Sequence, residues 1–255
     1  MPRLNNIVKF LNNYLKIKEV KDFSRNGLQV KGRPKVAKIA FTENASLDTF
    51  QQALRSGADL VVVHHGILWK SKYKQNAFLR ITKERISFLK RNGLSLYAAH
   101  LPLDRHKIVG NNAQLLALLG AEIKSGFSGK KYGKTIGWTG RFRSPVSVLK
   151  LAKILNKKLR TRCKVLSFGP AKVRTIAVCS GGGGSSPFYE ALDEKVDLYL
   201  SGEPAEVYTS AKEAKMNVIF AGHYATETVG VKALMEVVKN KFKVKTVFID
   251  DPTGL

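Results

Sequence analysis

Hydrophobic residues follow two different periods along this chain. Residues 3–16 carry apolar side chains every three or four positions, which predicts a helix, whereas residues 60–64 form a short apolar run of strand length. Runs of the two kinds alternate over most of the sequence, which is typical of an α/β protein. The expected strands are 35–41, 60–64, 94–99, 175–179 and 244–249, and residues 26–30 are expected to form a turn that leads into a short extended segment. The expected helices are 3–16, 46–56, 82–92, 111–119, 147–155, 205–214 and 229–242.

The order of strands and helices is repeated within the chain. Residues 38–65 match residues 175–203, with an offset of 138 residues over the later part of the match. Residues 100–104 match residues 223–227 with an offset of 123, because the basic segment 70–85 has no counterpart in the second copy. Two copies predict two similar α/β domains rather than a solenoid.

A change of pattern near residue 126 indicates where the first domain ends. Glycines recur every few residues from this point, which is typical of turns between strands. The last strand and the region of His223 are expected to pair with the first half, so that the chain leaves the first domain and returns to it. We therefore expect one domain at 1–126 plus 216–255 and a second at 127–215.

Four of the five histidines lie in three short clusters at the ends of expected strands. Imidazole nitrogens and carboxylate oxygens in such positions suit borderline divalent metals. A single histidine of this kind is more often an ordinary core residue, but matching positions in two copies favour a metal site with more than one ion. The clusters are His64 with His65, His100 with Asp104 four residues later, and His223 with Glu227 four residues later.

Two other features have simpler interpretations. Asp59 and Asp197 match in the repeat, but each lies between a helix and a strand, where a turn or cap role is favoured. The glycine-rich segment 180–187 precedes an expected helix and could cradle a phosphate. It lacks the Gly-Lys-Ser/Thr ending of a P-loop and the dinucleotide spacing, so a sharp turn is the favoured interpretation.

Composition bounds the class of protein. A length of 255 residues allows one or two domains, and 44% hydrophobic with 25% charged residues is typical of a soluble globular protein. The apolar runs are far shorter than the roughly 20 residues of a membrane span. The N-terminus lacks the apolar core of a secretory signal. Two cysteines, Cys163 and Cys179, exclude a disulfide framework and a cysteine-type zinc site, so a cytoplasmic location is expected.

The charge of the chain is extreme, with 44 basic against 19 acidic residues and a net charge of +25. Such a field attracts nucleic acid, nucleotides or anionic membranes. The basic residues are nevertheless spread along the whole sequence, and no zinc finger, RRM or helix-turn-helix signature accompanies them. A polyanion partner and a source organism with generally basic proteins explain the count equally well.

With these motifs assembled, the chain resembles the Nif-three-like family, also called GTP cyclohydrolase I type 2 homologues. The motifs cover the chain nearly end to end and in family order. The resemblance implies a two-domain α/β protein, a toroidal homohexamer and a dinuclear metal site lined by the two halves. The segments that carry it are Asn-Gly-Leu-Gln-Val at 26–30, Val-His-His-Gly at 63–66, His-Leu-Pro-Leu-Asp at 100–104, Gly-Asn-Asn-Ala-Gln-Leu at 110–115, Ser-Gly-Gly-Gly at 180–183, Leu-Ser-Gly-Glu at 200–203 and Gly-His-Tyr-Ala-Thr-Glu at 222–227.

The resemblance and the internal repeat indicate roles for individual residues. His100 lies beside the metal site in its motif and takes an auxiliary or catalytic role. Glu203, the repeat partner of His65, is a candidate general base or orienting group, and a plain structural role is equally open. The segment 41–46 is more polar than in relatives, and no large domain is inserted between the halves. The implied metal ligands are His64, His65, Asp104, His223 and Glu227.

The function implied is that of a metal-dependent hydrolase, with GTP cyclohydrolase as the named candidate. Two ions about 3.5–4 Å apart can activate water and polarise the substrate, and zinc, manganese, iron and nickel all suit these ligands. Lys70, Lys72 and Lys74 are candidates for holding the triphosphate, although solvated lysines are the favoured interpretation of each. Phosphoester hydrolysis is a variant. The alternative is a non-catalytic, metal-binding toroidal assembly that binds nucleic acid or a protein partner.

Overall fold

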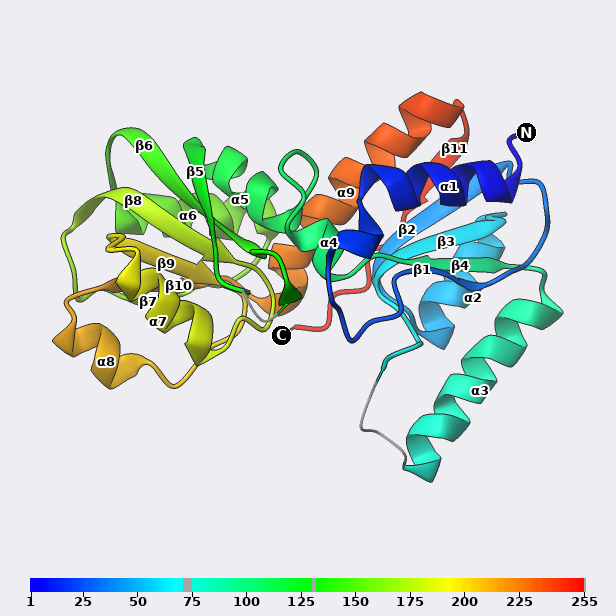
Figure 1. The fold of residues 1–255 in the computed structure, drawn as a ribbon, viewed down its shortest axis with the longest axis horizontal. Helices are drawn as coiled ribbons and strands as arrows, with labels where there is room; N and C mark the ends of the chain where they lie inside the picture. The colour runs from blue at the N-terminus through cyan, green and yellow to red at the C-terminus, as the bar shows by residue number, and fades with distance from the viewer. Residues whose placement is uncertain (71–74, 130–131, 255) are drawn as a thin grey trace. The chain divides into compact units, whose positions relative to one another are not determined.

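The computed structural model describes residues 1–70, 75–129 and 132–254, and it contains two compact α/β units. The first unit consists of Met1–Leu103 and Val231–Asp251, and the second of Asp104–Gly230 with the residues from Pro252 onward. Figure 1 shows the path of the chain, which passes from the first unit to the second within helix α4 (Leu101–Asp104) and returns within helix α9 (His223–Phe242). The chain therefore contributes two separate segments to the first unit.

The first unit is built on a five-stranded sheet with the order β1-β4-β3-β2-β11. Strands β2, β3, β4 and β11 are parallel to their neighbours, and β1 pairs with β4 in the antiparallel direction. Buried parallel strands carry nearly continuous apolar sequence, as Leu60–His65 does. The strands are β1 (Gly27–Val30), β2 (Lys38–Asn44), β3 (Leu60–His65), β4 (Ser95–Ala98) and β11 (Lys245–Phe248).

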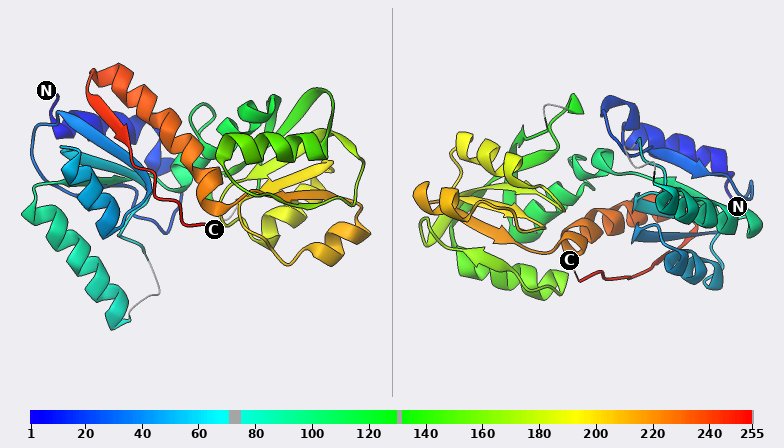
Figure 2. Two further views of the ribbon diagram at one scale, coloured as in Figure 1. Left: turned by 180° about the vertical axis from the view of Figure 1, so that it is seen from behind. Right: turned by 90° about the horizontal axis from the view of Figure 1, so that it is seen from below.

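Helices cover both faces of this first sheet (Figures 1 and 2). Phe50 of α2 (Leu47–Arg55) and Leu89 of α3 (Asn76–Arg91) pack with Val61 and Val63 in one core cluster. The other face is covered by α1 (Leu4–Tyr14) and the C-terminal part of α9, and the buried Tyr97 donates a hydrogen bond of 3.0 Å to Asn12 of α1. Each fully buried aliphatic or phenylalanine side chain of these two faces contributes roughly 1.5–3 kcal/mol to the free energy of folding.

The second unit is built on a six-stranded sheet with the order β5-β6-β8-β9-β10-β7. Helices α5 and α6 share a core cluster with one face, and α7 and α8 share a cluster with the other. The strands are β5 (Ala121–Phe127), β6 (Gly137–Ser147), β7 (Lys164–Leu166), β8 (Lys172–Cys179), β9 (Leu198–Ser201) and β10 (Asn217–Phe220), and the helices are α5 (Asn111–Leu119), α6 (Val148–Leu159), α7 (Ser185–Asp193) and α8 (Tyr208–Glu213).

The repeat in the sequence is a repeat in the fold. In the first unit the parallel strands β2, β3 and β4 are neighbours, and in the second unit β8, β9 and β10 have the same arrangement. Asp59 accepts hydrogen bonds from the backbone N–H groups of Ala37 and Lys38, and Asp197 accepts them from Arg174 and Thr175. The matched aspartates therefore share a structural role, but it is neither a turn nor a cap: each joins the residue before its own strand to the start of the neighbouring strand.

The limits of the two units differ from the expected ones at residues 126 and 216. Strand β5 pairs with β6, and β10 pairs with β9 and β7, so all of them belong to the second sheet. The glycine-rich segment after residue 126 joins two paired strands of one sheet, and it therefore marks a hairpin rather than a domain boundary. The last strand, β11, does pair with β2 of the first unit.

Two helices begin earlier than their hydrophobic periodicity indicates. Helix α3 begins at Asn76 rather than at residue 82, and α9 begins at His223 rather than at residue 229. The early start of α9 matters because it places His223 and Glu227 one turn apart on the same face of a helix. In the described part of the chain, no helix combines the length and apolar character that crossing a membrane requires.

Candidate metal centre

Three histidines of the first unit lie together at one edge of its sheet. His64 and His65 end strand β3, and His100 follows the neighbouring parallel strand β4, so the fold brings their side chains to the same edge. The ring centroids are 4.6 Å apart for His64 and His65, 5.1 Å for His64 and His100, and 5.3 Å for His65 and His100. Nitrogen atoms of the three rings lie within 4.8 Å of one another, as a metal site requires.

The rings of His64 and His65 are held by hydrogen bonds at Nδ1. In His64, which is fully buried, Nδ1 lies 2.9 Å from the backbone carbonyl of Ala99. In His65, Nδ1 lies 2.8 Å from Oε1 of Glu43 and 3.1 Å from Oδ1 of Asn44. Carbonyl and carboxylate oxygens only accept, so Nδ1 carries the proton in both rings and Nε2 is the nitrogen suited to a metal.

His100 is held in the same way by a residue that the sequence reasoning missed, Asp22. Nδ1 of His100 lies 3.0 Å from Oδ1 of this buried carboxylate, which also accepts from the backbone N–H groups of Ser24 and Leu101 and from the amide of Asn26. Burial alone would raise the pKa of Asp22, but the hydrogen bonds and charge of His100 and its neighbours outweigh it and hold that pKa below its usual value.

The second unit brings together His223, Glu227 and Glu203. Nε2 of His223 lies 3.0 Å from Oε2 of Glu227 one turn along α9, and Nδ1 lies 2.6 Å from Oε1 of Glu203 after β9. Burial would lower the pKa of His223, but the two carboxylates outweigh it and raise the pKa to about 9. Glu203 is half exposed and orients the ring, which is one of the roles the sequence left open for it.

Asp104 is a buried carboxylate of the second unit. Its Oδ1 accepts hydrogen bonds of 2.8 Å from the amide of Asn111 and 3.1 Å from the hydroxyl of Ser180. Burial and, after it, the negative charges of Asp104 and Glu227 raise the pKa of the Cys179 thiol to about 12. Burying a charged carboxylate that has only neutral hydrogen-bond donors costs free energy unless a cation lies near it. The surroundings of Asp104 therefore suit a divalent metal ion.

The glycine-rich segment 180–184 is part of this second group rather than a separate phosphate loop. Gly181 has a φ of +61°, and a Cβ atom there would overlap the carboxylate of Glu227. The carbonyl of Gly181 accepts from the backbone N–H groups of Gly202 and Glu203, at 3.1 and 3.0 Å. The glycine is therefore needed for close approach of the backbone to the acidic side chains.

Lys70 lies beside the support of His100. Its Nζ donates a hydrogen bond of 3.1 Å to the backbone carbonyl of Asp22, and it lines a pocket of about 490 Å³ together with Lys18, Arg25 and Ser24. Three basic residues and one acidic residue, Asp22, therefore line this pocket. Lys72 and Lys74, the other lysines considered for a triphosphate, lie outside the described residues.

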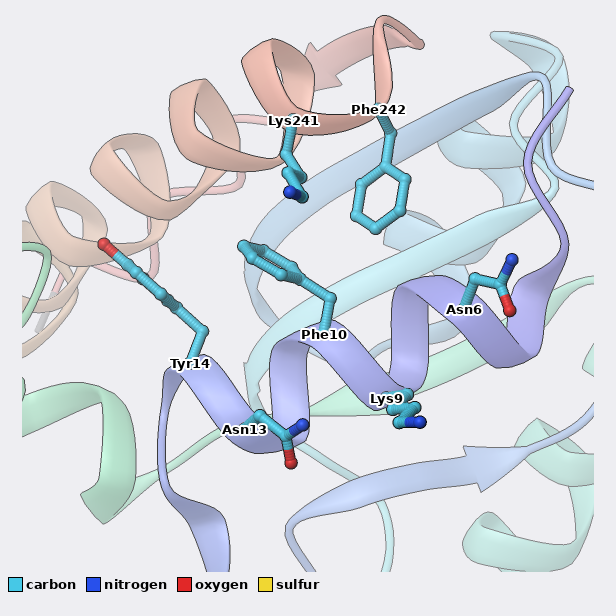
Figure 3. A pocket seen from close by; sticks show the side chains of 7 residues that line it. All are labelled: Asn6, Lys9, Phe10, Asn13, Tyr14, Lys241 and Phe242. Atoms are coloured by element: carbon cyan, nitrogen blue, oxygen red, sulfur yellow. The ribbon is translucent and has the colours of Figure 1, made fainter.

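A different pocket of the first unit, also of about 490 Å³, lies between α1 and the end of α9 (Figure 3). Phe10 meets Phe242 edge-on with ring centroids 5.4 Å apart, and Tyr14 stacks on Phe10. Lys241 lies over the ring of Phe10. The side chains labelled in Figure 3 include none of the residues implied as ligands, so this pocket is separate from the histidine group.

Comparisons with known proteins give the family. Residues 2–253 match the family model described as Duf34/NIF3 (NGG1p interacting factor 3). Proteins named GTP cyclohydrolase 1 type 2 homolog from Pyrococcus horikoshii and Archaeoglobus fulgidus are 48% and 44% identical to the chain, over 98% and 99% of both lengths. A solved structure titled protein ybgI, unknown function, has a TM-score of 0.89 at 34% identity over the whole of both chains. The chain therefore belongs to the Duf34/NIF3 family, as its motifs indicated.

Proposed function

We propose that this protein is a dinuclear metal-dependent hydrolase that acts on a nucleotide, with opening of the guanine ring of GTP and release of formate as the candidate reaction. The observation that carries the proposal is the donor set: imidazoles fixed at Nδ1 in one unit, and buried carboxylates in the other. The curated relatives named above support the choice of reaction. The proposed ligands of the two ions are His64, His65, Asp104, His223 and Glu227.

When bound, two divalent ions would supply Lewis-acid activation of water and of the substrate. The residues of the chain have other tasks. Glu203 orients the ring of His223, and Asp22 orients His100, which is the candidate proton acceptor. Release of C8 of guanine as formate consumes two waters, and each addition requires a group that removes a proton from water.

The basic pocket at Lys70 is the proposed site of the substrate phosphates. Lys18, Arg25 and Lys70 line it, and the buried hydroxyl of Ser24 is at its wall. Phosphate groups are favoured in such a pocket because three of its lining residues are cationic and one, Asp22, is anionic, and a hydroxyl donor is near. Phosphoester hydrolysis by the same ions remains the variant of this proposal.

The assembly and the compartment are further parts of the proposal. A toroidal homohexamer and a cytoplasmic location are expected for a member of this family, and the two free cysteines, Cys163 and Cys179, suit a reducing compartment. Light scattering of the purified protein tests the first, and fractionation of the source cells tests the second.

The deciding experiment measures formate release from GTP by metal-reconstituted protein. His223→Ala is run in parallel to remove the site, and His106→Ala serves as the matched histidine control because His106 lies outside the implied ligand set and accepts from the backbone N–H groups of Ile108 and Val109. We expect release by the wild type and the control and none by His223→Ala. No release by protein that holds two metals per chain would leave the alternative, a non-catalytic assembly that binds nucleic acid or a protein partner.

A further inference from the structure

We infer that the side of the second unit formed by helix α6 and the residues directly after it binds the phosphate backbone of duplex nucleic acid. The inference goes beyond the proposed metal function and does not depend on it, because it concerns residues to which that function gives no task. We call this surface the α6 face, and its exposed cations are Lys150, Lys153, Lys157, Lys158, Arg160 and Arg162.

The charge of the second unit is divided between the two sides of its sheet. Residues 123–189 contain fifteen lysines and arginines and no aspartate or glutamate, whereas residues 190–216 contain seven acidic and three basic residues. Helix α6 shares a core cluster with one face of the sheet, and α7 and α8 share one with the other, as the right-hand view of Figure 2 shows. A source organism with generally basic proteins would make both sides basic, so the division favours a partner for one side.

Helix α6 presents its lysines in one stripe. Its apolar residues, among them Leu151 and Leu155, are buried against the sheet. Lys150, Lys153 and Lys157 follow one another at intervals of three and four residues, so they share the exposed side along about 10 Å of helix. Over about 10 Å of its axis a duplex carries about six phosphates, so the three ammonium groups can contact separate phosphates.

The cations of the α6 face are not offset by acidic groups of the chain. Glu122, the last acidic residue before this segment, forms ion pairs with Lys124 and Arg143, at 3.6 and 3.3 Å. No carboxylate of the described residues forms an ion pair with a cation of the α6 face. Lysines three and four residues apart on a helix repel one another and destabilise it. A partner that supplies the negative charge explains why such a stripe is present.

The side chains of the α6 face suit phosphates rather than bases. Residues 141–174, all of which the structure describes, expose no aromatic ring, since Phe142 is buried and Phe168 packs partly buried against the cluster of the opposite face. Single strands are held largely by stacking of bases on aromatic rings. Lysine is a flexible point charge, and its phosphate contacts carry no sequence information. The α6 face should therefore bind duplexes of any sequence, with an affinity that falls steeply with salt.

The test compares two charge reversals of equal size in the full-length protein. The first acts on the stripe of α6: Lys150→Glu with Lys153→Glu and Lys157→Glu. The control acts on three exposed lysines in α8 or directly after α7 and α8: Lys195→Glu with Lys212→Glu and Lys215→Glu. Fluorescence anisotropy over a salt series gives the Kd for duplex DNA of mixed sequence. We expect the first variant to bind at least about 10-fold more weakly at low salt and to lose up to about 3 from the slope of log K against log salt, while the control keeps the slope of the wild type.

Two outcomes would overturn the inference. Equal losses in the two variants would show that net charge alone attracts the duplex. Unchanged duplex binding by the first variant, with loss of its binding to vesicles of phosphatidylserine and phosphatidylcholine, would make the α6 face a membrane contact instead. Thermal melts and metal content of both variants should match the wild type. If the reversal unfolds α6, Lys150→Gln with Lys153→Gln and Lys157→Gln removes the same contacts without adding negative charge, and the same loss of slope is expected.

Discussion

At the scale of single residues, His223 has the most unusual environment, because two carboxylates contact its two ring nitrogens. Its pKa is raised to about 9 from a reference of 6.5. In metal-free protein at neutral pH, this imidazole is therefore a cation that offsets the charge of Glu203 and Glu227. A divalent ion would take over this task, and the proton would leave because a protonated imidazole cannot bind a metal.

A pH dependence of stability follows from this environment. The pKa of His223 is higher in the folded than in the unfolded chain, so its stabilisation is full below pH 6.5 and is lost as pH rises through about 9. We expect the melting temperature of chelator-treated wild type to fall over this range more steeply than that of His223→Gln. Parallel curves for the two proteins would show that the carboxylates do not stabilise the charged ring.

The matched aspartates allow a second prediction, about stability alone. Asp197 accepts from two backbone N–H groups and the hydroxyl of Thr175, at 2.8–2.9 Å, whereas the bonds of Asp59 to backbone N–H groups are 2.7 and 3.4 Å long. Replacement by alanine should cost about 1–3 kcal/mol at each site, and more at Asp197. Urea denaturation measures the cost. Metal content should not change, and a loss of metal would contradict a purely structural role for the two aspartates.

At the scale of elements, the segment 180–184 combines two demands on the backbone. Gly181 and Gly184 both have positive φ, +61° and +71°, but only at Gly181 would a side chain meet the acidic residues, and nothing lies within 4 Å of a Cβ at Gly184. The two positions therefore separate backbone strain from crowding of the site.

This pair gives a matched test. Gly184→Ala should cost only backbone strain, about 1–3 kcal/mol, because φ +71° with ψ −164° is a conformation that essentially only glycine adopts, and metal binding should stay intact. Gly181→Ala should cost more and also weaken metal binding, because its methyl group displaces the carboxylate of Glu227. Calorimetry of metal binding and thermal melts on both variants check this. Equal effects of the two changes would show that the segment does not contact the metal ligands.

The sequence predicted what depends on local pattern and on repetition. Apolar periods and the internal repeat located most strands and helices, and the His-x-x-x-acid spacing led to the ligand pairs. It did not predict Asp22 and Glu43, because their partners, His100 and His65, are far away in sequence and only the sheet brings them together. The start of α9 at His223 was also missed, since polar first-turn residues hide the helical period. The spacing of His223 and Glu227 by four was the available signal.

At the scale of the whole molecule, the net charge of +25 is the feature that the proposed chemistry uses least. Three basic residues line the pocket at Lys70, and most of the others lie elsewhere along the chain. An unspecific attraction for polyanions follows from charge alone and needs no metal. Catalysis and polyanion binding should therefore depend on different residues.

The double variant Lys157→Glu with Lys158→Glu tests this separation, because both lysines are exposed at the end of α6, away from the ligand segments in sequence. Each phosphate contact contributes a slope of about −0.9 to the dependence of log K on log salt, so the double variant should reduce the slope for duplex DNA by up to about 2. Formate release should be unchanged, while His223→Ala should show the reverse pattern. Fluorescence anisotropy over a salt series measures the slope. A loss of DNA binding in His223→Ala would instead place the polyanion on the metal ligands, and the basic surface would then be part of the same site.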